Sequence, residues 1–257
     1  MTLSFVAKLR ILLKVMNVVK NWHHYIIAYL KLTRREHITL ELKNGLKIQL
    51  RVNSTDLIAF THVWILEEYK KPGFEIFDND VIIDIGGHIG LFALYVSQFC
   101  KEGRIYCFEP VKENFEMLQT NIKLNKLENI FAENLAVSRK DGNVTIYINN
   151  DESGHSIYIP SDNSIESESI SLNTVFQKNE IMICNYLKID CEGEEYEIID
   201  SLNDDYFKQI EKMCIEYHFV DEKPHLLESL ISKIKSFSFV VSTRNISDSI
   251  GFLYAKK

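Results

Sequence analysis

The chain has 257 residues, of which 46% are hydrophobic and 25% charged, with a formal net charge of −7 at pH 7. These values are typical of a globular protein and exclude a disordered chain, a collagen-like repeat and a polytopic membrane protein. The acidic balance argues against a nucleic-acid partner, because such proteins neutralise phosphates with an excess of Lys and Arg. The five cysteines form no Cys-x-x-Cys pair, and we recognise no cleavable signal segment, so we expect a cytoplasmic location.

The first predicted element, Leu3 to Leu32, combines apolar and basic residues. Four basic residues keep its apolar runs short of the ~20 residues that span a bilayer: Lys8, Arg10, Lys14 and Lys20. At 3.6 residues per turn the apolar residues share one side, which predicts an amphipathic helix or helix pair. We expect the side with Phe5, Leu9, Leu12 and Met16 to pack against the main domain or a second copy. The alternative is peripheral contact with an anionic membrane.

Next, the runs Ile38–Leu42 and Leu46–Val52 flank an Asn-Gly pair, which predicts a β-hairpin. Ser54 or Thr55 can then cap a helix that runs to about Tyr69, where Pro72-Gly73 ends it. Residues 1–72 are therefore predicted to form an N-terminal extension, and residues 73–257 the main domain.

From residue 80, short apolar runs alternate with helical patterns, which indicates an α/β doubly wound, Rossmann-like sheet. The predicted strands are Val81–Ile85, Arg104–Phe108, Ile130–Val137, Tyr186–Ile189, Met213–His218, Phe237–Ser242 and Gly251–Ala255. The predicted helices are Ile89–Phe99, Lys112–Asn125, Glu194–Leu202 and His225–Lys235. An extra antiparallel strand is expected at Asn143–Ile148, and a polar loop at Asn149–Ser169.

The first of these strands runs directly into a glycine turn, with Gly86, Gly87 and Gly90 ahead of a helix. Glycines allow a sharp bend and a close approach by a ligand. Nicotinamide-dependent dehydrogenases carry a similar turn. Asp84 favours another ligand, because its carboxylate would repel a pyrophosphate and attract an ammonium or sulfonium group.

The second strand ends at Glu109, whose carboxylate is placed to accept hydrogen bonds from both ribose hydroxyls. A ligand with a ribose and a cationic amino-acid tail fits both carboxylates, and S-adenosylmethionine is such a ligand. His88, inside the turn, either contacts this cofactor or only packs the start of the helix.

Four segments of the chain resemble the FkbM-type S-adenosylmethionine-dependent methyltransferases. They are Asp84–Gly90, Phe108–Pro110, Asn134–Ser138 followed by Asp141-Gly142, and Leu187–Glu195. The resemblance implies a seven-stranded sheet with one antiparallel strand and methyl transfer, usually to an oxygen of a sugar or natural product. Family members commonly carry Asp where this chain has Asn173.

After the third strand, Asn134 and the backbone of Ala136 are placed to bind adenine, with Leu135 against its face. The fourth and fifth strands bring Asp190, Glu192 and His218 to the same edge. These three residues could hold a divalent metal, or could orient and deprotonate a hydroxyl without one. Histidine titrates near neutral pH, so His218 is the better base, with Asp190 orienting it. A structural role for His218 at a strand end is the simpler alternative.

The sequence therefore predicts an S-adenosylmethionine-dependent O-methyltransferase acting on a small-molecule or glycan hydroxyl. Two alternatives remain open at this stage. One is a nicotinamide-dependent dehydrogenase, and the other is a non-catalytic, membrane-associated binding protein with the same fold.

Overall fold

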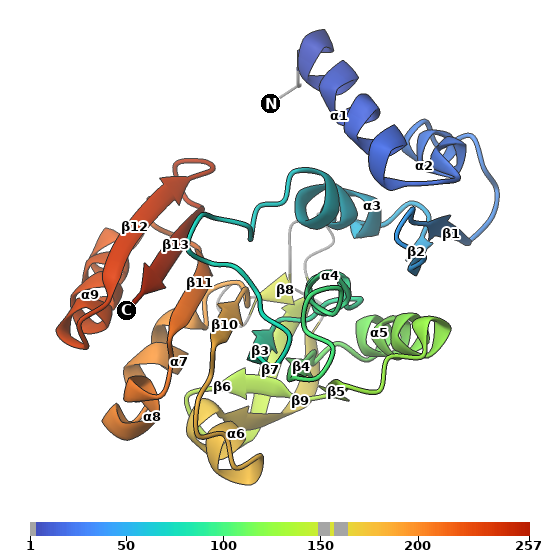
Figure 1. Cartoon of the computed structure of the whole chain (residues 1–257). Helices are drawn as coiled ribbons and strands as arrows, with labels where there is room; N and C mark the ends of the chain where they lie inside the picture. Colours follow the sequence, from blue (N-terminus) through green and yellow to red (C-terminus); the bar gives the residue numbers. More distant parts are fainter. Residues whose placement is uncertain (1–3, 149–154, 157–163) are drawn as a thin grey trace.

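A computed structural model describes residues 4–148, 155–156 and 164–257 (Figure 1). Its centre is a seven-stranded sheet with the order β12-β13-β11-β10-β3-β4-β5. The strands are β3 (Val81–Ile85), β4 (Arg104–Phe108), β5 (Ile130–Glu133), β10 (Tyr186–Ile189), β11 (Lys212–Tyr217), β12 (Val240–Asn245) and β13 (Gly251–Lys256). Strand β13 is antiparallel to both of its neighbours, and the other pairs from β11 to β5 are parallel. The predicted fold class is confirmed.

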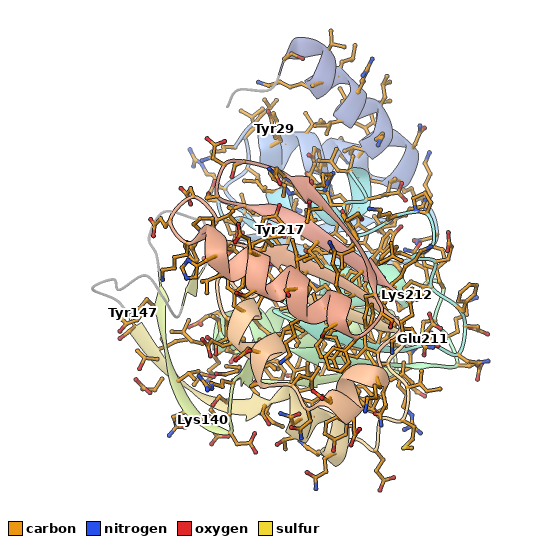
Figure 2. All side chains as sticks on the ribbon, turned by 90° about the vertical axis from the view of Figure 1, so that its left-hand side faces the viewer. Tyr29, Lys140, Tyr147, Glu211, Lys212 and Tyr217 are labelled. Atoms are coloured by element: carbon orange, nitrogen blue, oxygen red, sulfur yellow. The ribbon has the colours of Figure 1, made fainter. Side chains whose placement is uncertain are left out.

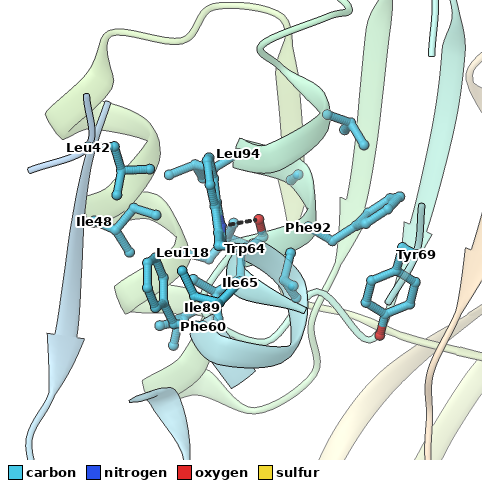
Figure 3. Close-up of a cluster of buried hydrophobic side chains, with 14 of the residues drawn as sticks. Leu42, Ile48, Phe60, Trp64, Ile65, Tyr69, Ile89, Phe92, Leu94 and Leu118 are labelled. Atoms are coloured by element: carbon cyan, nitrogen blue, oxygen red, sulfur yellow. Dashed lines mark hydrogen bonds between the residues drawn. The ribbon is translucent and has the colours of Figure 1, made fainter. Parts of the chain in front are cut away.

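Helices cover both faces of this sheet because successive side chains of a strand point to opposite sides. Ile82 packs in one hydrophobic cluster with α4 (Leu91–Val96) and α5 (Lys112–Asn125). Figure 3 shows Leu94 of α4 and Leu118 of α5 in this cluster. The neighbouring Ile83 packs in the other cluster. That cluster contains side chains from α6 (Leu172–Lys178), α7 (Glu195–Ser201), α8 (Asp204–Lys208) and α9 (Pro224–Ser236).

The N-terminal extension joins the first of these clusters. It contains α1 (Phe5–Val18), α2 (Trp22–Tyr29), the antiparallel hairpin β1 (His37–Glu41) and β2 (Lys47–Arg51), α3 (Asp56–Phe60) and the π-helical turn η1 (Thr61–Ile65). The hairpin is confirmed, whereas the predicted helix to Tyr69 ends at Ile65. Trp64 is buried in the cluster, and its indole N–H donates to Leu91 O at 3.2 Å. The division at residue 72 stays a prediction.

Helix α1 does not bury the face predicted from the sequence. Val15 is fully buried, whereas Leu9 and Met16 are 45% and 36% exposed. The prediction assumed one apolar face, but α1 has two, and the core takes the side with Ile11 and Val15. Among the described residues, none of the helices has the length and apolar character needed to cross a membrane.

A second, four-stranded sheet has the order β6-β9-β7-β8. Its strands are β6 (Ala136–Ser138), β7 (Gly142–Ile148), β8 (His155–Ser156) and β9 (Ser164–Ser171). The single strand predicted at Ile130–Val137 is therefore two strands in two sheets. The loop prediction is wrong for residues 155–156 and 164–169, where hydrogen bonding to β7 overrides the polar composition. Residues 149–154 and 157–163 lie outside the described part of the chain.

Two short helices, α6 and α8, were missed because five to seven residues show no helical period. Asn173 in α6 connects them: its amide N donates to Ser201 O at 2.9 Å and its amide O accepts from Asn203 N at 2.8 Å. An Asp could not donate to Ser201 O, so Asn173 fits this bridge and has a structural role.

Candidate active site

A cavity of about 500 Å³ opens where β3, β4, β10 and β11 reach their carboxyl ends. This volume lies within the usual range for a small-molecule site, and the position is the usual one in doubly wound sheets. Eight of the predicted site residues line it: Gly86, Gly87, His88, Glu109, Ala136, Asp190, Glu192 and His218. The other four, Asp84, Gly90, Asn134 and Leu135, are not part of this lining.

The glycine turn is shaped by the protein itself. Gly86 has a φ of 75°, and a Cβ on it would lie 1.7 Å from Asp190 O. Gly90 has a φ of 87°, and a Cβ there would lie 2.4 Å from Leu118 Cδ1. Both positions therefore require glycine so that the turn can pack against β10 and α5, independently of any ligand.

Asp84 is fully buried behind the turn and is neutralised by a lysine. Its Oδ1 lies 3.0 Å from Lys188 Nζ, and the Cys107 thiol donates to its Oδ2 at 3.4 Å. Lys188 also donates to Gly86 O at 2.7 Å, so this pair holds the turn in place. Burial alone would lower the pKa of Lys188, but Asp84 and Asp190 raise it above the ordinary value. The direct contact between Asp84 and a ligand cation stays a prediction.

Glu109, at the tip of β4, lines the cavity with a carboxylate that the protein already uses. Its Oε2 accepts from His88 N at 2.8 Å, and its Oε1 accepts from Val111 N at 2.9 Å and the Asn114 amide at 3.3 Å. Burial raises its pKa to about 7 despite these donors. A carboxylate has about four acceptor sites, so about one is left for a ribose hydroxyl rather than the two predicted.

A network of hydrogen bonds connects the Glu109 carboxylate to the N-terminal hairpin through Asn114 and Arg51. The Arg51 guanidinium donates to Asp56 at 2.7 and 3.0 Å and to the Asn114 amide oxygen at 2.7 Å. His88 Nε2 lies 3.5 Å from Asp56 Oδ1. Burial lowers the pKa of His88 to about 4, so the imidazole is neutral at physiological pH.

Of the three residues predicted to bind adenine, Asn134 and Leu135 are outside the cavity lining and have contacts within the protein. The Asn134 amide donates to Glu109 O at 2.8 Å and to Pro110 O at 2.9 Å. Leu135 packs against the second hydrophobic cluster. These contacts give both residues a structural role, and their contact with adenine stays a prediction. Ala136 and Val137 do line the cavity.

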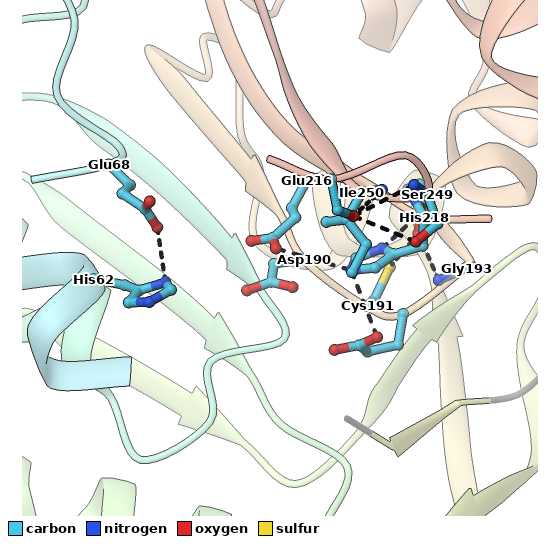
Figure 4. A network of polar contacts seen from close by, with 12 residues as sticks. His62, Glu68, Asp190, Cys191, Gly193, Glu216, His218, Ser249 and Ile250 are labelled. Carbon is cyan, nitrogen blue, oxygen red and sulfur yellow. Dashed lines mark hydrogen bonds and ion pairs between the residues drawn. The ribbon is translucent and has the colours of Figure 1, made fainter. Parts of the chain in front are cut away.

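Carboxylates gather on the opposite wall, at the ends of β10 and β11 (Figure 4). Asp190 accepts a hydrogen bond from the Tyr69 hydroxyl at 3.0 Å and lies 3.7 Å from Lys188 Nζ. Glu216 also lines the cavity, and burial together with Asp190 raises its pKa well above the ordinary value. The raised pKa favours the protonated, neutral form of the Glu216 carboxyl group beside the ionised carboxylates of this wall.

His218 lies at the centre of these carboxylates, and its side chain is 3% exposed. Its Nδ1 is 3.2 Å from Glu195 Oε1, and its Nε2 is 3.5 Å from Glu192 Oε2. Burial would lower its pKa, but Glu195, Glu192 and Asp190 raise it to about 10. His218 is therefore a cation at neutral pH, which argues against the predicted role of general base.

Glu192, in contrast to His218, has a pKa close to neutral pH. Its backbone is left-handed, with a φ of 54°, and its side chain lines the cavity. Burial raises its pKa to about 7, although the His218 cation lowers it. A carboxyl group that titrates near neutral pH beside an imidazolium is suited to accept a proton.

Asp190, Glu192 and His218 each offer one possible ligand atom, and these atoms lie within 4.8 Å of one another. Two carboxylates and an imidazole suit a divalent cation. A metal could bind His218 only through a deprotonated nitrogen, however, and the carboxylates around it favour the protonated form. A metal site and a metal-free proton site therefore stay alternative predictions for these three residues.

The third wall of the cavity comes from the N-terminal extension, and the sequence analysis did not assign it to the site. Its residues are Thr55, Ile58, Ala59, His62, Val63, Glu68 and Tyr69. His62 Nδ1 lies 3.0 Å from Glu68 Oε2, and this contact raises the pKa of His62 (Figure 4). A π-helical turn such as η1 is frequently found at functional sites.

The sequence profile of the methyltransferase FkbM domain matches residues 84–241. The chain belongs to the FkbM methyltransferase family. This membership favours methyl transfer over the nicotinamide-dependent alternative, and the match begins at Asp84 in the strand before the glycine turn.

Two curated relatives and one solved structure illustrate the relationship. The chain is 24% identical to Methyltransferase 1 of Beauveria bassiana, over 54% of this chain and 65% of that protein. It is 22% identical to the 31-O-demethyl-FK506 methyltransferase FkbM of Streptomyces tacrolimicus, over 79% of this chain and 89% of that protein. The crystal structure of methyltransferase FkbM from Methylobacillus flagellatus superposes with a TM-score of 0.49 at 15% identity, and the superposition covers 77% of this chain and 53% of that chain. The chain thus spans less than two thirds of the Beauveria relative.

Proposed function

We propose that this FkbM-family methyltransferase uses S-adenosylmethionine to methylate a hydroxyl oxygen of a small molecule, such as a sugar or natural product. The carboxylate wall around His218 is the observation that carries the proposal. The proposal also accords with the name of the Streptomyces relative, which specifies an O-demethyl substrate. A cytoplasmic location stays a prediction.

The charge of the cavity fits this cofactor. Five carboxylates, Asp84, Asp190, Glu192, Glu195 and Glu216, surround two cations, Lys188 and His218. Burial and the neighbouring Asp190 carboxylate raise the pKa of Glu216, so placing a further negative charge here is unfavourable. A sulfonium or ammonium group would relieve this repulsion, whereas a dinucleotide pyrophosphate would increase it.

S-adenosylmethionine, when bound, supplies a methyl group activated by the sulfonium charge. The remaining work falls to the chain's own residues. The Gly86-Gly87 turn, Glu109 and Ala136 would hold the cofactor, and Glu192 would accept the acceptor hydroxyl's proton while the His218 cation stabilises the ionised carboxylate. Positioning can supply about 7–11 kcal/mol of barrier reduction, and a positioned base about 10²–10⁴-fold.

A labelling experiment tests the proposal. Purified protein would be incubated with methyl-labelled S-adenosylmethionine and fractionated cell metabolites and glycans, and products identified by mass spectrometry and NMR. An O-methyl product with equimolar S-adenosylhomocysteine supports the proposal, and activity should persist in the presence of EDTA. Glu192→Gln is the inactive control.

Other outcomes would replace parts of the proposal. A labelled methyl group on carbon or nitrogen would refute O-methylation while leaving the cofactor assignment intact. Cofactor binding without turnover on any fraction would favour the non-catalytic alternative. Loss of activity with EDTA, restored by Mg²⁺, would assign Asp190, Glu192 and His218 to a metal.

A further inference from the structure

Helix α1 carries a second apolar face that nothing in the chain covers within the described residues. Val6, Leu9, Leu13 and Met16 are 58%, 45%, 53% and 36% exposed. Their spacing of three, four and three residues places them on one stripe, opposite the face that enters the core. We call these four residues the outer stripe. Figure 1 shows α1 at the edge of the molecule, on the far side of α3 from the sheet.

The charge around this stripe differs in sign from the rest of the protein. Residues 1–35 contain seven basic residues, Lys8, Arg10, Lys14, Lys20, Lys31, Arg34 and Arg35, and no Asp or Glu. The remaining 222 residues contain 22 Lys and Arg against 36 Asp and Glu. A strongly basic end on an acidic protein is an electrostatic feature that attracts an anionic surface.

Helix α2 and the segment after it expose further side chains of the same kind. Trp22, Tyr29, Leu30 and Leu32 are 38%, 51%, 53% and 71% exposed. Figure 2 shows Tyr29 in the same upper part of the molecule as α1. Trp and Tyr combine an apolar ring with a polar group, which suits them to the boundary between lipid and water.

We propose that α1 and α2 dock peripherally on an anionic lipid surface. The outer stripe enters the boundary between headgroups and acyl chains, and the basic residues contact lipid phosphates and carboxylates. A second copy of the chain fits this surface less well, because symmetric packing of α1 on α1 would bring together two copies of a helix that has three cations, Lys8, Arg10 and Lys14, and no anionic side chain. The proposal does not depend on the reaction that the protein catalyses.

Docking would also orient the cavity. The Lys14 ammonium group donates to Ile65 O at 3.2 Å, so α1 is attached to η1. The same turn supplies His62 and Val63 to the cavity wall. A membrane contact through α1 would therefore set the α3–η1 wall of the cavity near the lipid surface.

Vesicle sedimentation of the full chain tests this inference. We expect binding to vesicles that contain phosphatidylglycerol, little binding to pure phosphatidylcholine, and loss of binding at high salt. Leu9→Ser/Leu13→Ser should abolish the interaction. Lys8→Gln/Arg10→Gln should weaken it by about 25-fold, at about fivefold per charge. The matched control is Lys112→Gln/Lys123→Gln on α5, which removes the same charge elsewhere and should change binding by less than twofold.

Folding is checked by the thermal midpoint and by affinity for S-adenosylhomocysteine, which the exposed substitutions should leave unchanged. The inference is overturned if the unaltered chain does not sediment, or if it sediments equally with neutral vesicles. It is also overturned if Leu9→Ser/Leu13→Ser converts a dimer into a monomer in light scattering, because a second copy would then cover the outer stripe.

Discussion

The side-chain carboxylate of Glu195 contacts both the backbone N–H and the imidazole ring of His218. Glu195 Oε1 accepts from His218 N at 2.8 Å and lies 3.2 Å from Nδ1 of the same residue. Its other oxygen accepts from Gly193 N at 2.7 Å. Glu195 is fully buried, so this one carboxylate fixes the turn after β10 to the end of β11 and directs the other imidazole nitrogen toward Glu192.

Replacing Glu195 should therefore destabilise the fold. We expect Glu195→Ala to lower the free energy of unfolding by about 3–5 kcal/mol, because it leaves the buried His218 cation without its closest partner. Glu197, two residues later, pairs with Arg139 on the surface at 3.0 Å. Glu197→Ala should cost less than about 1 kcal/mol in the same urea titration. Equal effects of the two substitutions would contradict the role given to Glu195.

The contact between Glu195 and His218 also predicts how the stability of the protein depends on pH. The pKa of His218 is about 10 in the folded protein, above its unfolded value of about 6.5. The imidazolium thus contributes stability that is fully present below about pH 6.5 and is lost as the pH rises through about 10. In Glu195→Gln this alkaline loss should be smaller and should begin at lower pH, and NMR titration of His218 provides the direct check.

Glu192 should control the rate at acidic pH. With a pKa of about 7, its carboxyl group loses the ability to accept a proton as the pH falls, so kcat should decline below neutrality. A bound sulfonium would favour the ionised carboxylate and move the midpoint of kcat below that of kcat/KM. Glu192→Gln should lower kcat by about 10²–10⁴-fold and remove this decline.

The pKa of Glu109 is also about 7, so the effects of Glu109 and Glu192 on the pH profile must be distinguished. Its protonation should change the dissociation constant of S-adenosylhomocysteine, whereas that of Glu192 should change kcat at saturating cofactor. A decline in kcat that survives in Glu192→Gln would assign the base to another residue, with Asp190 the nearest candidate.

Cofactor affinity should depend on the free acceptor site of Glu109. We expect Glu109→Ala to weaken S-adenosylhomocysteine binding by tenfold or more, equivalent to about 1.5–3 kcal/mol for a charge-assisted hydrogen bond. Glu133, at the end of the neighbouring β5, pairs with Lys178 at 2.6 Å and serves as the control. If calorimetry gives the same affinity for Glu109→Ala as for Glu133→Ala, the ribose contact is refuted.

The central sheet could be predicted because its strands are continuous apolar runs. Those predicted at Val81–Ile85, Arg104–Phe108 and Tyr186–Ile189 have the observed bounds. Lys188 is a signal that the sequence analysis did not use, since a charge inside a buried strand requires a partner. The cavity wall formed by α3 and η1 could not be predicted, because its approach to the glycine turn depends on packing between segments about 30 residues apart.

The direction of side chains was the other limit. The sequence places His218, Asp190 and Glu192 near one edge of the sheet, but the pKa of a histidine depends on which carboxylates face it. Likewise, α1 is apolar on two sides, and periodicity alone does not tell which of them enters the core.

The last prediction concerns Arg51, which connects the hairpin through Asn114 to Glu109 in the cavity wall. Asp56 is fully buried and accepts from Arg51 N at 2.8 Å and from its guanidinium. Burial would raise the pKa of Asp56, but Arg51 and His88 hold it below the ordinary value. Its charge thus contributes stability above about pH 3.9 that is lost as the pH falls through the folded pKa.

Arg51→Met should destabilise the protein by about 3–5 kcal/mol, because it strands the buried Asp56 carboxylate, and acid unfolding should begin at higher pH. Arg51→Met/Asp56→Asn should recover much of this loss, because no unpaired charge remains. Its affinity for S-adenosylhomocysteine should nevertheless stay several-fold weaker, since Arg51 also holds the Asn114 amide that donates to Glu109. Arg244→Met, which removes a half-exposed partner of Glu68, is the control for loss of an arginine. If Arg51→Met changes neither stability nor affinity, the hairpin is energetically independent of the cofactor wall, and residues 1–72 act as a separate unit.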